Sequence, residues 1–145
     1  KVALAGKVAG IHWWYASNSH AAELTAGYYN TNGNNAYKGI AQVFRENGNA
    51  ALDFTCLEMK NPQPEEADKC FSRPESLVTQ VIQAAESEGV QFNGENALPV
   101  GSWDQYDTIL HKHPHIHAFT LLRLDKKLVN EGLQNLKGFV NLMHG

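Results

Sequence analysis

Four apolar runs alternate with helical segments along this 145-residue chain, and this alternation constrains the fold more than any other feature of the sequence. The runs are nearly continuous in apolar or small residues, which is typical of buried strands, and they lie at 8–14, 50–57, 90–92 and 118–122. Helices are expected in the segments that follow, at 36–44, 77–85, 102–110 and 128–143. Four strand-then-helix units predict a parallel α/β fold, either half of an eight-stranded (β/α) barrel or a small open sheet with helices on both faces.

The helix around 77–85 carries the clearest boundary signals. Ser72 and Glu75 have the S-x-x-E spacing of a capping box, and Pro74 would lie in the first turn, where its missing N–H does no harm. We therefore expect the Ser72 hydroxyl to cap this helix. The stretch before it, 61–72, is rich in Pro and Glu without periodicity and predicts a loop.

The composition excludes several function classes. Twelve Lys and Arg against fifteen Asp and Glu give a formal charge of −3, so the chain is a poor candidate for binding nucleic acid or an anionic membrane surface. No apolar run approaches the roughly 18 residues of a membrane span. Two cysteines, Cys56 and Cys70, are too few for a disulfide framework and are expected as free thiols. The apolar fraction of 43% is enough for a core, so residues 1–145 are expected to belong to one domain.

Ligand sites of parallel α/β folds gather at the carboxyl ends of the strands, and this rule selects a short set of residues. They follow the four expected strands in order: His12, Trp13 and Trp14, then Thr55 and Glu58, then Glu95 and Asn96, and finally Arg123. Aromatic faces stack on the C–H faces of a pyranose, while carboxylates, amides and a guanidinium group bind its hydroxyls. The set therefore suggests a sugar site.

Five motifs in register resemble the beta-amylase family. They are KVAGIHWWY (7–15), SHAAELTAGYYN (19–30), FTCLEM (54–59), GENALP (94–99) and LLRL (121–124). Their order and approximate spacing also fit, and the similarity extends from Lys7 to Met143. The resemblance implies a (β/α)8 TIM-barrel fold to which this chain supplies about four C-terminal β/α units, a half-barrel.

The resemblance also implies an activity and the residues that carry it. Beta-amylases are inverting, exo-acting hydrolases that release maltose from the non-reducing ends of α-1,4-glucans, without a cofactor or a metal. Glu95 matches the general base of the family. The positions that match sugar-contacting residues are Lys7, His12, Thr55, Asn96, Ala97 and Arg123.

Several of these residues have a structural interpretation beside the functional one. Lys7 could pair with an acid, Arg123 could organise the carboxylates, and His12 could be a hydrogen-bonded histidine of the packed interior. Glu23 is expected to be a structural hydrogen-bond partner, and Glu58 is expected to hold the inner loop of the family. Trp13 and Trp14, which are further candidates for the sugar platform, would face opposite sides if extended, so at least one is expected to pack.

An alternating row of histidines is also present at 111, 113, 115 and 117. An extended backbone would place all four imidazoles on one face, where they could bind zinc, copper or nickel. Pro114 interrupts the row, and the matching region of beta-amylases is variable, so a solvent-exposed loop without metal is the favoured interpretation.

The chain lacks any match to the general acid of the family, which comes from the N-terminal half of the barrel. The expected partners are therefore an α-1,4-glucan and either the missing N-terminal half-barrel or another copy of the chain. Two alternatives stay open: a non-catalytic glucan-binding module, and a structural half-barrel that pairs with another subunit.

Overall fold

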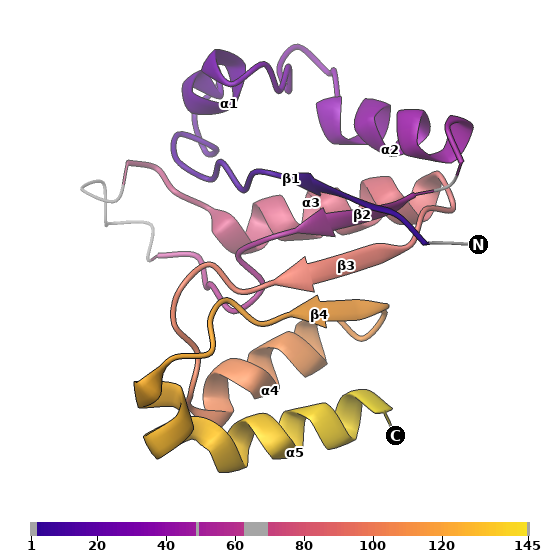
Figure 1. The fold of residues 1–145 in the computed structure, drawn as a ribbon. Helices are drawn as coiled ribbons and strands as arrows, with labels where there is room; N and C mark the ends of the chain where they lie inside the picture. Colours follow the sequence, from indigo (N-terminus) through magenta and orange to yellow (C-terminus); the bar gives the residue numbers. More distant parts are fainter. Residues whose placement is uncertain (1–2, 49, 63–69, 145) are drawn as a thin grey trace.

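The computed structural model describes residues 3–48, 50–62 and 70–144. Strands and helices alternate, with a short additional helix near the start and a π-helical turn before the last helix (Figure 1). In chain order the elements are β1 Ala5–Val8, α1 Ala21–Thr25, α2 Ala36–Glu46, β2 Ala51–Phe54, α3 Pro74–Ser87, β3 Phe92–Glu95, α4 Trp103–Lys112, β4 Ala118–Thr120, η2 Leu128–Gly132 and α5 Leu133–His144. The expected alternation of strands and helices is confirmed.

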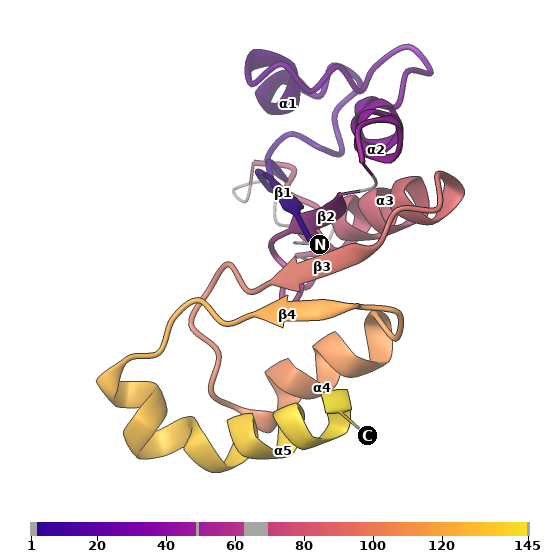
Figure 2. The same ribbon diagram turned by 45° about the vertical axis from the view of Figure 1, so that its right-hand side comes forward.

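The four strands form one parallel sheet in the order β1-β2-β3-β4 (Figures 1 and 2). An open doubly wound sheet reverses its strand order at one point, and no reversal occurs among these strands. Right-handed crossovers between strands in sequential order place every connecting helix on the same face. The topology is therefore that of a (β/α) barrel segment.

The apolar core lies between one face of this sheet and the helices. Val8, Leu52, Phe54 and Phe92 alternate along the strands with polar residues and are buried. Apolar residues of the helices join them in one cluster: Tyr37 and Ala41 of α2, Leu77, Val78 and Val81 of α3, Tyr106 and Ile109 of α4, and Phe139 of α5. The ring centroids of Tyr106 and Phe139 lie 4.9 Å apart, which joins α4 to α5. Burial of this apolar surface is the main stabilising contribution.

The opposite face of the sheet is polar. Lys7 pairs in register with Asp53, and Asp53 pairs with Asn93 on the next strand. Glu95 follows two residues after Asn93 and thus points to the same face. A search for strands by their apolar runs does not predict this row of polar side chains.

The first strand is shorter and earlier than the predicted 8–14. After Val8 the backbone leaves the sheet and bonds to the segment before α3: the N–H of Trp14 donates to the carbonyl of Cys70 at 2.7 Å, and the N–H of Arg73 donates to the carbonyl of His12 at 3.1 Å. Gly10 permits this path, because a Cβ there would lie 2.7 Å from Thr55 Cγ2 and 2.8 Å from Cys56 Sγ. The apolar run 9–14 is therefore a packed connection.

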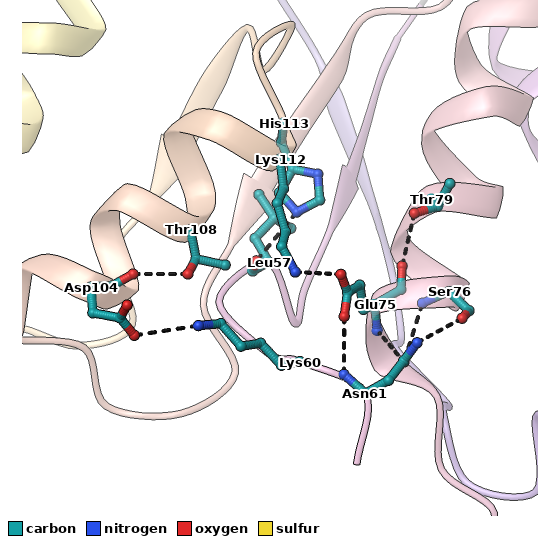
Figure 3. A network of polar contacts seen from close by, with 10 residues as sticks. All are labelled: Leu57, Lys60, Asn61, Glu75, Ser76, Thr79, Asp104, Thr108, Lys112 and His113. Atoms are coloured by element: carbon teal, nitrogen blue, oxygen red, sulfur yellow. Dashed lines mark hydrogen bonds and ion pairs between the residues drawn. The ribbon is translucent and has the colours of Figure 1, made fainter. Parts of the chain in front are cut away.

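The predicted capping box of α3 is wrong, although Pro74 does lie in the first turn. Ser72 instead bonds through its hydroxyl to His12 Nδ1 at 2.6 Å. The helix start is capped from a distance by Asn61, whose Oδ1 accepts the N–H of Glu75 at 3.1 Å and that of Ser76 at 3.4 Å (Figure 3). Most of the loop expected over 61–72, at 63–69, lies outside the described residues.

The last two β/α units also differ from the prediction in detail. β3 begins at Phe92 and ends at Glu95, later than the predicted 90–92. The prediction depends on an apolar run, whereas Asn93 and Glu95 of this strand are polar and lie on the face away from the helices. The helix expected over 128–143 begins with the π-helical turn Leu128–Gly132 before α5. Gly132 approaches Gly101 so closely that a Cβ there would lie 3.0 Å from Gly101 Cα. None of the helices in the described ranges is long and apolar enough to span a membrane.

Candidate active site

Glu95 is the last residue of β3 and lies where the strand-end rule places a ligand site. Its side chain is on the polar face, and the residue is only 7% exposed. A carboxylate taken so far out of water needs a charged or hydrogen-bonding partner.

Lys7 supplies that partner from β1. Its Nζ forms an ion pair with Glu95 Oε2 and lies 3.6 Å from Asp53 Oδ2 on the strand between them. The Lys7 side chain is 48% exposed, whereas the two carboxylates are largely buried, at 16% for Asp53 and 10% for Glu95. The interpretation of Lys7 as the partner of an acid is confirmed.

Glu58 fixes the turn that follows Glu95. Its buried carboxylate accepts the N–H of Ala97 at 3.0 and 3.1 Å and the N–H of Leu98 at 2.6 Å. These bonds join the segment after β2 to the turn after β3. Glu58 thus holds the loop after β2 in place, as expected. Because the N–H of Ala97 is already bonded here, its sugar-contacting role stays a prediction.

Asn96 joins the turn after β3 to the segment after β4. The residue is fully buried, its Oδ1 accepts the N–H of Leu122 at 2.7 Å, and its Nδ2 donates to the carbonyls of Leu98 and Leu122. Every polar atom of the side chain is thus engaged with the backbone. Asn96 fixes the ends of two neighbouring strands relative to each other, and its contact with sugar stays a prediction.

His12 lies in the connection after β1, and Thr55 lies in the connection after β2. These two connections are in contact. His12 is buried, bonds to Ser72 and stacks on Trp13 with ring centroids 4.1 Å apart. Burial lowers the pKa of this imidazole, so it is neutral at neutral pH. Thr55 is half-buried and faces Gly10 in the connection that carries His12. His12 therefore is a hydrogen-bonded interior histidine in this structure, and the binding roles of both residues stay predictions.

Trp13 and Trp14 both contact neighbouring rings and both remain partly open to solvent. Trp13 stacks on His12, and Trp14 packs on Phe71 with centroids 5.3 Å apart. The two indoles are 49% and 41% exposed. Each therefore retains an accessible surface that could stack on sugar.

Arg123 lies apart from the Lys7–Glu95 pair. The residue is exposed and lines a cavity of about 520 Å³ between the turn after β3 and the segment after β4, together with Ser102, Asp125 and Glu131. Arg123 has no ion pair among the described residues, so its sugar-contacting role and its role in organising the carboxylates both stay predictions.

Asp53 is the site residue that sequence reasoning missed. It is the only charged residue in the strand sequence ALDF, and its Oδ1 is buried without a hydrogen-bond partner among the described residues. A charge inside an otherwise apolar strand is itself a signal, because a buried carboxylate is costly unless it has a function or a partner.

The four alternating histidines do not share a face. His111 belongs to α4, where its Nδ1 lies 3.0 Å from Asp107. His113 is buried, and its Nε2 lies 3.3 Å from the carbonyl of Leu57 (Figure 3). No group of three metal-ligating side chains suited to a metal ion occurs in residues 3–48, 50–62 or 70–144.

A polar network joins α3 to α4 through the segment after β2 (Figure 3). Glu75 of α3 accepts the N–H of Asn61 at 3.1 Å and pairs with Lys112 of α4. Lys60 donates to Asp104 of α4 at 3.4 Å. The segment after β2, which carries Glu58, is thus held between both helices.

Glu23 is a structural hydrogen-bond partner, as predicted. It is fully buried, and its carboxylate accepts the hydroxyl of Tyr37 at 2.6 Å, lies 2.7 Å from His20 Nδ1 and accepts from Asn30 at 3.5 Å. Cys56 and Cys70 are free thiols, as expected.

Comparison with known proteins gives consistent similarities. The family model described as "Glycosyl hydrolase family 14" matches residues 1–145. "Beta-amylase 2, chloroplastic" of Arabidopsis thaliana is 39% identical, and the "Beta-amylase" of Glycine max is 42% identical. Among solved structures, the catalytic domain of beta-amylase from Paenibacillus polymyxa superposes with a TM-score of 0.78 at 32% identity.

The chain matches only a part of each of these proteins. The alignments include 98% of the chain and 28% of the Arabidopsis protein, and 99% of the chain and 31% of the Glycine max protein. The structural match includes 96% of the chain and 33% of the Paenibacillus chain. The similarity therefore concerns a segment of a longer catalytic domain.

Proposed function

Because the chain belongs to glycosyl hydrolase family 14, we propose that it forms part of a beta-amylase, a hydrolase of the α-1,4-glucosidic bonds of starch-type glucans. The proposed enzyme releases maltose from non-reducing ends with inversion at the anomeric carbon. The observation that carries the proposal is the buried carboxylate of Glu95 at the carboxyl end of β3, paired with Lys7.

Glu95 acts as the general base in this proposal. Its carboxylate takes a proton from a water molecule while the water oxygen forms a bond to the anomeric carbon and the glycosidic bond breaks. The base must be ionised, and the ammonium group of Lys7 favours the ionised form. The loop around the base is fixed by Glu58 and Asn96, so the carboxylate does not have to be ordered when the glucan binds.

The general acid comes from outside this chain. Inversion needs a second carboxyl about 6.5–9.5 Å from the first, so that water fits between them. Of the nearby acids, Glu58 is engaged with backbone N–H groups and Asp53 faces Lys7. No motif of this chain resembles the one that carries the general acid in beta-amylases, so the proposal places the acid on a further segment, either the N-terminal half-barrel or another copy of this chain.

One observation favours the alternative of a non-catalytic glucan-binding or structural half-barrel. β1 and β4 are the outer strands of the four-stranded sheet, and each has one edge without a strand in the described residues. Such edges pair readily with another chain. A partner that closes the barrel without supplying an acid would leave binding or assembly as the function.

The test is incubation of the full-length protein with maltoheptaose, followed by proton NMR of the products. Release of β-maltose establishes an inverting exo-hydrolase. Glu95→Gln should abolish this release, whereas the matched control Glu46→Gln, at an exposed position of α2, should keep it. Binding of maltoheptaose without turnover in the unmodified protein would favour the glucan-binding alternative.

A further inference from the structure

Asp53 stands between the two members of the Lys7–Glu95 pair. β2 lies between β1 and β3, Asp53 is in register with Lys7, and its Oδ2 is 3.6 Å from Lys7 Nζ. Lys7 must therefore extend across β2 to reach Glu95, and it passes Asp53 on the way. The ammonium group lies between two largely buried carboxylates on neighbouring strands.

The fold itself does not use Asp53 as a hydrogen-bonding group. Its Oδ1 is buried and has no partner among the described side chains and backbone, and Oδ2 faces only the ammonium group of Lys7. Leaving a buried carboxylate oxygen without a partner costs stability. The neighbouring positions of the strand, Leu52 and Phe54, are fully buried and apolar. The charge of Asp53 therefore acts on the polar face of the sheet and not in the apolar core.

We propose that Asp53 is a positioning residue of the reaction: it attracts Lys7 Nζ from β2 while Lys7 pairs with Glu95 on β3, so that the ammonium group orients Glu95 without neutralising it. This inference rests on the proposed role of Glu95 as general base. One ammonium group between two carboxylates leaves a net negative charge, so Glu95 keeps more of its affinity for a proton than it would in an exclusive pair with Lys7.

The charged groups around Glu95 come from several elements. They are Lys7 on β1, Asp53 on β2 and Glu58 in the segment after β2. Glu58 bonds to the turn after Glu95, and Arg123 lines a separate cavity. Asp53 and Lys7 are the groups whose removal should change the affinity of Glu95 for a proton, and they should do so in opposite directions.

The experiment compares Asp53→Asn and Lys7→Met in the full-length protein. Asp53→Asn keeps the shape of the side chain and removes the negative charge, so the carboxyl of Glu95 should titrate about one pH unit lower, as read by carbon-13 NMR. Lys7→Met should move the same titration to higher pH. On maltoheptaose, Asp53→Asn should lower kcat by about three- to tenfold with little change in KM, because a weaker base slows the chemical step. Asp107→Asn, at a half-exposed position of α4 beside His111, is the matched control.

The outcomes separate this inference from the proposed function. An Asp53→Asn protein that is folded and has the Glu95 titration of the unmodified protein overturns the positioning role, whatever its activity. Opposite shifts in the two variants support that role even if no maltose is released, and the absence of release then counts against the proposed function alone. A loss of thermal stability in Asp53→Asn without a shifted titration indicates a merely structural role.

Discussion

Glu58 binds the backbone of Ala97 through both carboxylate oxygens, at 3.0 and 3.1 Å, from a segment thirty-nine residues earlier in the chain. One of these oxygens also accepts the N–H of Leu98 at 2.6 Å. The turn that follows the candidate base Glu95 is therefore held by a buried negative charge on the neighbouring β/α unit. Hydrogen bonds to a charged acceptor are stronger than those between neutral groups.

Replacing this charge should loosen the turn. Glu58→Gln retains one acceptor oxygen and introduces an amide beside two N–H donors, so we expect a loss of about 2 kcal/mol of unfolding free energy. Calorimetry of the full-length protein would measure a lower Tm, and kcat on maltoheptaose should fall because Glu95 is less well positioned. Glu46→Gln, in a surface ion pair of α2, should leave both unchanged. An unchanged Tm in Glu58→Gln would contradict this assignment.

The buried carboxylate of Glu23 should be equally sensitive. Tyr37 is fully buried, and its hydroxyl donates to Glu23 at 2.6 Å, so Tyr37→Phe leaves a buried charged oxygen short of one donor. We expect a cost of about 1–3 kcal/mol, measured by urea unfolding of the full-length protein. Tyr29→Phe, at an exposed tyrosine, is the control and should have little effect. A loss that is equal in the two variants would show that the Glu23 contact is not the cause.

The sequence predicts the order of strands and helices, because burial of apolar residues decides both. The strand boundaries are less predictable. β1 is AGKV and β3 is FNGE, and each carries polar residues on the face away from the helices. A search for apolar runs places the first strand in the connection 9–14, where the backbone bonds to the segment before α3. Such pairings between distant segments leave no local pattern.

The candidate site, too, can be predicted from the sequence only in part. Glu95 and Lys7 follow from motifs, whereas their ion pair, which spans β2, is known only from the structure. The predicted cap Ser72 instead bonds to His12, and Asn61, for which the sequence predicted no role, caps α3. Ser72 forms a hydrogen bond with a buried partner that is distant in sequence and not the bond that the local capping motif predicts. Asp53 lies in the strand ALDF, whose apolar residues predict the strand but not the role of its one charged residue.

The two thiols should differ widely in reactivity. Burial raises the pKa of Cys56 to about 12, and the negative charge of Glu58 adds to this effect. At pH 8 only about one thiol in ten thousand is then ionised, and the thiolate is the reactive form. Cys70 is exposed. Iodoacetamide at pH 8, followed by mass spectrometry, should modify Cys70 in the folded protein and modify Cys56 only after denaturation. Equal modification of both in the folded protein would contradict the burial of Cys56.

Buried His113 should make stability depend on pH in one direction. Burial is the largest cause of the lowered pKa of this imidazole, which lies against the carbonyl of Leu57. Between the lowered folded value and the unfolded value of about 6.5, the unfolded chain binds more protons than the folded chain. The stability contribution of neutral His113 is therefore present above about pH 6.5 and is lost as the pH falls below it. His12 has a pKa lowered in the same way and contributes with the same sign.

Thermal unfolding between pH 5 and 7.5 should show a Tm that rises with pH. His113→Gln should flatten this rise, whereas His115→Gln, at an exposed position, should not. A slope that is the same in His113→Gln and in the unmodified protein would assign the dependence to other groups.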